Sequence, residues 1–184
     1  MEEPSQIKEI LYEEIKKIPA KELEELFVNE NYSKLIENLF EKILPRISNV
    51  GGEISEKLGV LSESISHYIL TEMMIPSQRK IVYNNIEVDI VIPDLNMLKD
   101  RSDDAIIIYF AKSLNNNTIQ KKIDELQIIQ KNIKNIWVIA HDKMNLSCKT
   151  YQLSNNENSL SDLFTDLKNF VNSKKLDKLK IFKT

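Results

Sequence analysis

The chain has 184 residues, of which 42% are hydrophobic and 29% are charged, and its net charge is −3. This composition suffices for one buried core with a small extension, and it excludes a protein whose whole surface attracts DNA. Only three glycines occur, at positions 51, 52 and 59. They form neither a phosphate-binding loop nor a dinucleotide fingerprint, so the commonest nucleotide-binding enzymes are not expected.

The cellular location follows from cysteine usage and from the apolar segments. A single cysteine, Cys148, excludes an internal disulfide and a zinc site built from thiolates alone. The acidic N-terminus lacks the pattern of a secretory signal, and the longest apolar run, residues 105–111, is too short to span a bilayer. We therefore predict a soluble cytoplasmic protein that makes no membrane contact.

The first part of the chain has helical spacing of its apolar residues. It predicts three helices, at residues 5–18, 21–28 and 32–44, and Pro45 is expected to end the third. The sequence Asn49-Val50-Gly51-Gly52 is the clearest boundary signal in the chain. We therefore predict a helical extension over residues 1–48 and an α/β domain over residues 49–184.

The second part begins with a helix and then changes to the alternation of strands. The helix is expected over residues 53–75, with an interruption allowed at Gly59. Strands are expected at 79–83 and 86–92, joined by a tight turn at Asn84-Asn85, because asparagine tolerates positive φ. After a polar loop at 94–104, the most apolar strand covers residues 105–112 and is expected at the centre of the sheet.

The remaining elements complete an α/β pattern. They are a helix that starts at the N-cap Thr118, strands at 136–140 and 148–153, a helix at 159–172, and a basic tail expected to form a short strand or to stay mobile. The first three strands suit an antiparallel meander, and a strand–helix–strand crossover makes the next pair parallel. The prediction is a mixed β-sheet flanked by helices.

Acidic and basic side chains occur at positions that a phosphodiesterase could use. Asp89 lies in Ile-Glu-Val-Asp-Ile-Val-Ile, and Lys112 ends the apolar strand in Phe-Ala-Lys. Residues two apart in a strand share a face, so Glu87 is expected beside Asp89, and Phe110 beside Lys112. Carboxylates that hold a divalent ion, with a lysine that steadies the nucleophile, are the groups that phosphodiester hydrolysis needs. An ordinary cross-strand ion pair is the competing interpretation of Asp89 and Lys112.

This order of elements and residues resembles the PD-(D/E)XK nuclease superfamily, the restriction-endonuclease-like fold, including uncharacterised archaeal members. The resemblance covers residues 53–140 and implies catalytic roles for Asp89 and Lys112. It also implies a Mg²⁺ or Mn²⁺ site with the ligands Glu63, Glu87 and Asp89. Phe110 occupies the position where the superfamily has its second acid, so the motif is degenerate.

The principal hypothesis is a nuclease-like fold without catalysis, which acts as a binding or scaffolding module in nucleic-acid processing. Its DNA or RNA contacts would come from local basic patches, such as the lysines of the tail. One alternative is an active Mg²⁺- or Mn²⁺-dependent nuclease in which another acid, Glu87 or Glu125, replaces the missing one. The other is a protein–protein interaction module, or a homodimer through the N-terminal helices, with no nucleic-acid role.

Overall fold

Five strands form one sheet in the order β1-β2-β3-β4-β5. In the computed structural model, which describes residues 3–153 and 158–181, these strands are β1 (Gln78–Tyr83), β2 (Ile86–Ile92), β3 (Ile106–Phe110), β4 (Ile136–Ala140) and β5 (Lys149–Gln152). The first two pairings are antiparallel, and β3–β4 and β4–β5 are parallel. The predicted mixed sheet, with its meander and crossover, is confirmed.

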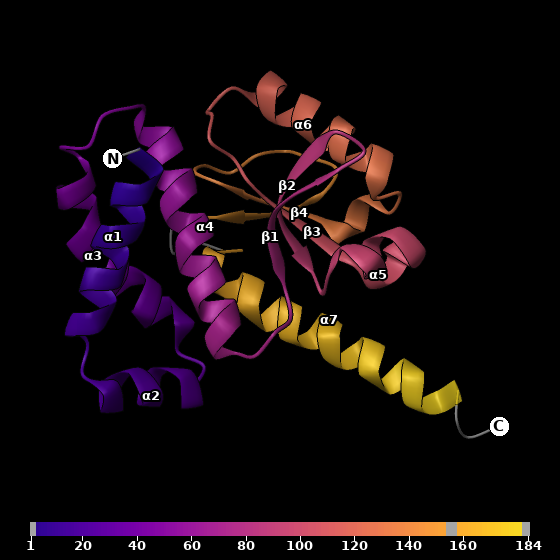
Figure 1. Cartoon of the computed structure of the whole chain (residues 1–184), viewed down its shortest axis with the longest axis horizontal. Helices are drawn as coiled ribbons and strands as arrows, with labels where there is room; N and C mark the ends of the chain where they lie inside the picture. The colour runs from indigo at the N-terminus through magenta and orange to yellow at the C-terminus, as the bar shows by residue number, and fades with distance from the viewer. Residues whose placement is uncertain (1–2, 154–157, 182–184) are drawn as a thin grey trace.

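Seven α-helices surround this sheet within the described ranges (Figure 1). They are α1 (Glu3–Lys17), α2 (Ala20–Val28), α3 (Tyr32–Ile47), α4 (Ile54–Glu72), α5 (Leu95–Asp100), α6 (Asn116–Ile129) and α7 (Leu160–Ile181). Helix α4 separates the sheet from α1 and α3, and α6, the crossover helix, lies on the other side of the molecule. The α/β class with helices on both sides of the sheet is therefore observed, and α4, β1, β2, β3, α6 and β4 follow one another in the predicted order.

Two apolar cores lie on the two faces of the sheet. Side chains of α1, α3, α4 and α7 form the core on one face, and side chains of α6 form the core on the other. Strand β3 contributes to both: Ile108 and Phe110 belong to the α4-side core, and Ile107 belongs to the α6-side core. Its burial on both faces confirms that the most apolar strand is central.

The N-terminal helices use their apolar faces inside the chain. Ile7 and Leu11 of α1 and Leu35 and Leu39 of α3 are buried in the α4-side core, which also contains Ile90 of the sheet. This packing removes from water most of the apolar stripe that would otherwise be available for a partner. None of the helices in the described ranges combines the length and the apolar character that a membrane span needs.

The β1–β2 hairpin changes faces in its middle. Val88 belongs to the α6-side core but Ile90 to the α4-side core, although residues two apart normally share a face. Ile81 of β1 pairs with Val88 of β2, and Arg79 pairs with Ile90. Lys80, which lies between Ile81 and Arg79, has a φ of 47°. A positive φ is uncommon for a residue with a side chain, and it reverses the local alternation. Asp89 therefore stands where its strand changes faces.

One expected helix end was wrong, and one interruption that the sequence allowed does not occur. Helix α3 does not end at Pro45 but continues to Ile47, whose side chain is fully buried, so core packing supports the last turn despite the missing proline N–H. Helix α4 is continuous through Gly59. A Cβ at Gly59 would lie 2.8 Å from Lys112 Cγ and 3.0 Å from the Ala111 carbonyl oxygen, so glycine is needed for close contact with β3.

Other boundaries differ because short motifs outweigh periodicity. The predicted loop at 94–104 contains α5 and a short 3₁₀ helix (Ser102–Asp104), and the Asp94 side chain caps α5 by accepting from the Met97 N–H. Asn115, not Thr118, caps α6. Helix α7 extends to Ile181, so the part of the tail expected as a strand or as a mobile end is helical; residues 182–184 lie outside the described residues.

Candidate functional site

Four charged side chains meet between helix α4 and the first three strands. They are Glu63 of α4, Arg79 of β1, Asp89 of β2 and Lys112, two residues after β3, and we call them the charge cluster. Two acids and two bases from α4, β1, β2 and the segment after β3 are thus brought together, although Glu63 and Lys112 are 49 positions apart in the sequence. Such convergence of titratable groups is typical of functional sites, although structural ion pairs also produce it.

Glu63 is the most buried member, with only 1% of its side chain exposed. Its Oε1 accepts a hydrogen bond from Arg79 Nη2 at 2.7 Å, and its Oε2 lies 3.6 Å from Lys112 Nζ. Both carboxylate oxygens therefore face cations. A buried carboxylate needs such partners, because removing an isolated charge from water is costly.

Asp89 uses its two oxygens for different purposes. Oδ2 accepts a hydrogen bond from the Phe110 N–H at 2.9 Å, and Oδ1 accepts one from Lys112 Nζ at 3.2 Å. The β2–β3 ladder ends at the pair Ile90↔Ile108, so the carboxylate takes the place of a main-chain acceptor for Phe110. Burial raises the pKa of Asp89, and the Lys112 charge and the Phe110 N–H oppose that rise.

Lys112 lies between the two carboxylates. Burial lowers its pKa, but the charges of Asp89 and Glu63 together outweigh this effect, so the net pKa is raised. The amine is consequently protonated at neutral pH. The stem of Lys112 passes close to Gly59, which leaves the space that the lysine needs to reach the acids.

Phe110 fills the position where the resemblance requires an acid. Its side chain is fully buried in the α4-side core, the same side on which Lys112 passes over Gly59. A ring that packs among apolar residues supplies no oxygen ligand. Its burial also shows that this position belongs to the core rather than to an accessible surface.

Glu87, the third predicted metal ligand, is exposed on β2, two residues before Asp89, where the strand changes faces. None of the ion pairs found among the described residues includes it, and no cluster of three or more His, Cys, Asp or Glu able to hold a metal was found in that part of the chain. The residues as arranged do not fit a divalent-ion site, since the oxygens of Glu63 and Asp89 already face N–H and ammonium groups. The metal roles of Glu63, Glu87 and Asp89 stay predictions.

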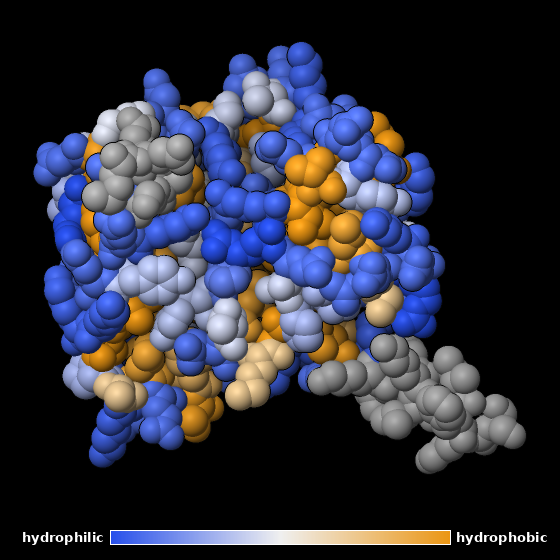
Figure 2. Space-filling view, in the orientation of Figure 1, coloured by the Kyte–Doolittle hydropathy of each residue, from blue (hydrophilic) through white to orange (hydrophobic). Residues whose placement is uncertain are grey.

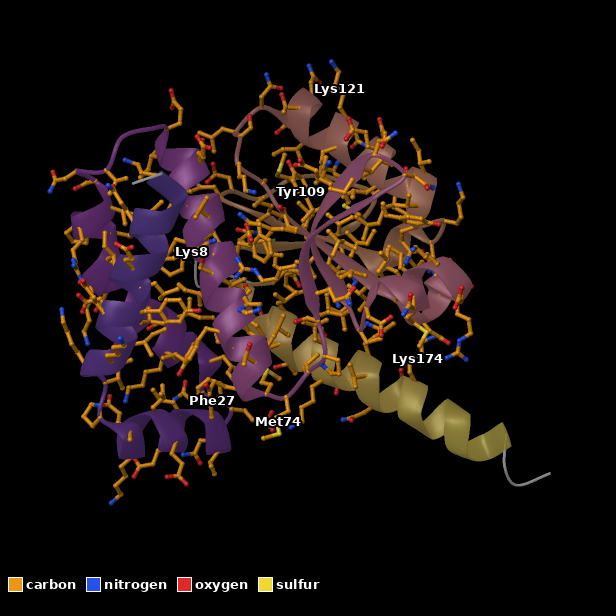
Figure 3. The ribbon with its side chains drawn as sticks, in the orientation of Figure 1. Lys8, Phe27, Met74, Tyr109, Lys121 and Lys174 are labelled. Carbon is orange, nitrogen blue, oxygen red and sulfur yellow. The ribbon has the colours of Figure 1, made fainter. Side chains whose placement is uncertain are left out.

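Sequence reasoning missed the basic residues that border the cluster. Lys8 of α1 has its pKa lowered by burial first and then by the nearby charges of Lys80 and Arg79 (Figure 3). Burial and the Arg79 charge likewise lower the pKa of His67. Alternation would place Arg79 beside Ile81, so only the unexpected φ of Lys80 directs it to Glu63. A sequence pattern does not reveal such a reversal.

Other polar and charged side chains lie away from the cluster. Glu125, considered as a relocated acid, pairs with Lys122 on the surface of α6. His141 and Asp142 form an exposed pair after β4, at 3.0 Å. Gln130 is fully buried and donates to the carbonyl oxygens of Ser102 and Ala105, which ties the loop before β3 to the end of α6. Of the basic tail, Lys174 pairs with Asp104, and the side chains from residue 175 onward lie outside the described ones.

No family model matches this chain. No curated protein matches it either. A solved structure of metal-depleted Ecl18kI in complex with uncleaved, modified DNA is similar to it, with 18% sequence identity and a TM-score of 0.46, over 86% of this chain. The alignment spans 58% of that protein, a little over half of its length. This is a likeness of fold.

Proposed function

We propose that this chain is a nuclease-like protein without phosphodiester hydrolysis, which binds nucleic acid at the charge cluster as part of nucleic-acid processing. The observation that carries the proposal is the arrangement of the site: the buried ring of Phe110 occupies the acid position, and Lys112 Nζ lies between the two acids that remain. The cluster resembles a nuclease site in its residue types, but its carboxylate oxygens already face N–H and ammonium groups and are not free to bind a metal.

The loss of hydrolysis follows from the requirements of the metal. Mg²⁺ needs several oxygen ligands in near-octahedral geometry. Here Glu63 and Asp89 are the buried acids, and Arg79 and Lys112 neutralise them. A divalent ion would have to displace two cations and would still lack the second strand acid. Such displacement would break the ion pairs of Glu63 and Asp89 and would leave Arg79 and Lys112 without their acidic partners.

Binding of nucleic acid follows from the surroundings of the cluster. Lys8 and Lys80 lie near Arg79 and Lys112, so four cations gather around Glu63 and Asp89. Phosphate groups bind lysine and arginine through charge-assisted hydrogen bonds. An otherwise acidic chain thus carries a local basic region next to the cluster, which is the kind of patch that the net charge of −3 still allows.

Binding is tested by a salt titration with labelled single- and double-stranded DNA and RNA. Lys80→Gln is the informative variant, because Lys80 is exposed and its loss leaves the ion pairs of the cluster intact. We expect it to weaken binding and to reduce the salt slope by about one, as expected for a lost phosphate contact. Lys121→Gln, on the exposed surface of α6, is the matched control. Absence of binding at low ionic strength contradicts the proposal.

Catalysis is tested with the same nucleic acids in the presence of Mn²⁺ and Mg²⁺. We expect no cleavage by the native chain. Cleavage that disappears in an Asp89→Ala variant would overturn the inactive assignment, because a contaminating nuclease would not respond to that change.

One observation favours the active alternative. Glu63 Oε2 and Asp89 Oδ1 both lie near Lys112 Nζ, at 3.6 and 3.2 Å, so a helix acid is already beside the strand acid. Glu63 could therefore serve as the relocated acid once Arg79 is removed. In this case Arg79→Gln should produce or increase Mn²⁺-dependent cleavage, and Glu63→Gln should abolish it. If neither variant changes the outcome, this alternative is excluded.

A further inference from the structure

A second site lies at the end of the sheet away from the charge cluster. It is a pocket of about 550 Å³ between the end of α2, the segment after α4, the end of β2, and helices α5 and α7. Phe27, Met74 and Lys174, labelled in Figure 3, mark three of its sides. A volume of this size suits a small molecule, since ligand pockets typically measure about 300–1,000 Å³.

The walls of the pocket are mainly apolar and include methionines. Phe27, Ile92 and Phe170 provide rigid surfaces, and Met73, Met74 and Met97 provide flexible ones. Met74 is 90% exposed and has a φ of 54°, and its side chain stands at the rim (Figure 3). Apolar surface, in orange, lies along the same lower edge of the molecule in Figure 2. Methionine adapts to irregular apolar ligands because its unbranched chain is flexible and its sulfur is polarisable.

Of the three cations that line the pocket, Arg101 has the longest ion-pair distance. Lys168 is paired with Glu30, and Lys174 with Asp104 at 2.8 Å. Arg101 makes only a 3.5 Å contact with Asp104 and a hydrogen bond to the Met97 sulfur, and its side chain is half exposed. Three cations against two acids give these lining residues an excess of one positive charge. The apolar wall therefore ends beside an available guanidinium.

We propose that this pocket binds a small organic molecule with an apolar body and a single carboxylate. The apolar body would lie against the aromatic rings and the methionines, and the carboxylate would pair with Arg101, whose planar fork matches it in two hydrogen bonds. Shape gives the pocket little selectivity because the methionines adapt, so the charge of the ligand decides which molecules bind. This site is independent of the charge cluster and does not require nucleic acid.

The methionines provide a direct readout. Of the five methionines of the chain, three line the pocket, Met144 packs in the core on the α6 side, and Met1 is outside the described residues. With ¹³C-methyl-methionine labelling, decanoate is titrated below its micelle-forming concentration. We expect saturable shifts of the Met73, Met74 and Met97 signals and none of the Met144 signal.

Probes of equal length and different charge test the role of the cation. Decan-1-ol and decylammonium should bind at least about fivefold more weakly than decanoate, since a charge-assisted hydrogen bond is lost. Arg101→Gln should reduce decanoate affinity to that of decan-1-ol, and Lys121→Gln should leave it unchanged. The exposure of Arg101 makes unfolding of the variant unexpected, and the unchanged Met144 signal would confirm its fold.

Three results would overturn this proposal. They are equal affinity for decanoate and decan-1-ol, shifts of Met144 as large as those of the pocket methionines, and the lack of saturable shifts with every probe. The first would remove the carboxylate requirement, the second would indicate nonspecific association, and the third would show that the pocket takes no ligand of this class.

Discussion

Two buried glutamates, each held by two cations, have different roles in this molecule. Glu14, on α1, pairs with Lys17 and Arg46, and the three residues join α1 to α3. Glu63, on α4, pairs with Arg79 and Lys112. Lys17 is 61% exposed, whereas Arg79 is only 19% exposed; Arg46 and Lys112 are equally exposed, at 36%. The second acid also differs: Arg46 pairs with the exposed Glu13, and Lys112 pairs with the enclosed Asp89.

The direction of the pKa shifts separates the two networks. The hydrogen bond from Lys17 lowers the pKa of Glu14, so the ionised acid is favoured where it stands. Burial raises the pKa of Asp89, so its ionised form is held at a cost. A network that favours the ionised form of its acid serves the fold. A network that keeps an acid in a place where burial disfavours the ionised form is a candidate for binding or chemistry. The same residue types thus form a helix clamp in one region and a candidate site in the other.

The largest expected difference is in stability. Glu63→Gln leaves Arg79 and Lys112 without their shared buried charge, and should lower the free energy of unfolding by about 3 kcal/mol. Glu14→Gln removes a carboxylate whose partners reach solvent, Lys17 most of all, and should cost about 1 kcal/mol or less. Urea denaturation of both variants measures the contrast. Equal losses would show that the two networks differ only in position.

A substitution near the cluster should have an intermediate effect. Gly59→Ala places a Cβ within 2.8 Å of Lys112 Cγ and 3.0 Å of the Ala111 carbonyl oxygen, so helix and strand must separate. Overpacking of this kind costs about 1–3 kcal/mol. The same variant should weaken nucleic-acid binding, because it displaces the lysine. Ser33→Ala, on the half-buried start of α3, is a control for a small change that adds no atom against a neighbour and removes only the hydrogen bond to Glu37. Normal binding with lowered stability in Gly59→Ala would place the effect in the fold alone.

The acid limb of the stability curve should show opposite slopes for the two networks. The lowered pKa of Glu14 contributes stability above the unfolded pKa, and this contribution is lost as pH falls. The raised pKa of Asp89 has the opposite sign: its contribution is present below the unfolded pKa and is lost as pH rises. Between pH 6 and pH 3, the native chain should lose its advantage over Glu14→Gln and gain relative to Asp89→Asn. Parallel slopes in urea titrations would contradict the assignment.

The smallest expected effect is on Tyr109, labelled in Figure 3. Burial, followed by the charge of Asp89, raises its pKa to about 12. Asp89→Asn should therefore lower the pKa of Tyr109 by a fraction of a unit, whereas Glu14→Gln should leave it unchanged. Ultraviolet absorbance of the phenolate between pH 9 and 12 measures this, with Tyr109→Phe to identify its signal. A pKa that does not respond to Asp89→Asn would show that burial alone sets it.

The fold was largely predictable because periodicity and turn chemistry dominate it. Ile86–Ile92 and Ile136–Ala140 were predicted with the bounds that the structure has, and Asn84 and Asn85 both have the positive φ of a tight turn. Burial explains the misses: Ile47 extends α3 past a proline, and Gly59 is retained for a close contact rather than a break. The residues next to Ile47 and Gly59 in the sequence do not reveal the core around Ile47 or the contact of Gly59 with Lys112 and Ala111.

The candidate site was predictable only in part. The sequence indicated Glu63, Asp89 and Lys112, and the structure brings them together. Arg79 was missed because its side chain reaches α4 only through the reversal at Lys80, and Lys8 because it comes from a helix outside the resemblance. Both residues were missed because their place beside the cluster depends on how distant parts of the chain pack together, and residue type does not reveal this.

The divided use of the Asp89 carboxylate links the site to the sheet. One oxygen holds the Phe110 amide of the central strand, and the other holds the lysine. An anion that draws Lys112 away would leave Asp89 with less compensation, and so would change how firmly that amide is protected. Hydrogen–deuterium exchange at a single backbone position would then report, from inside the protein, whether its surface is occupied.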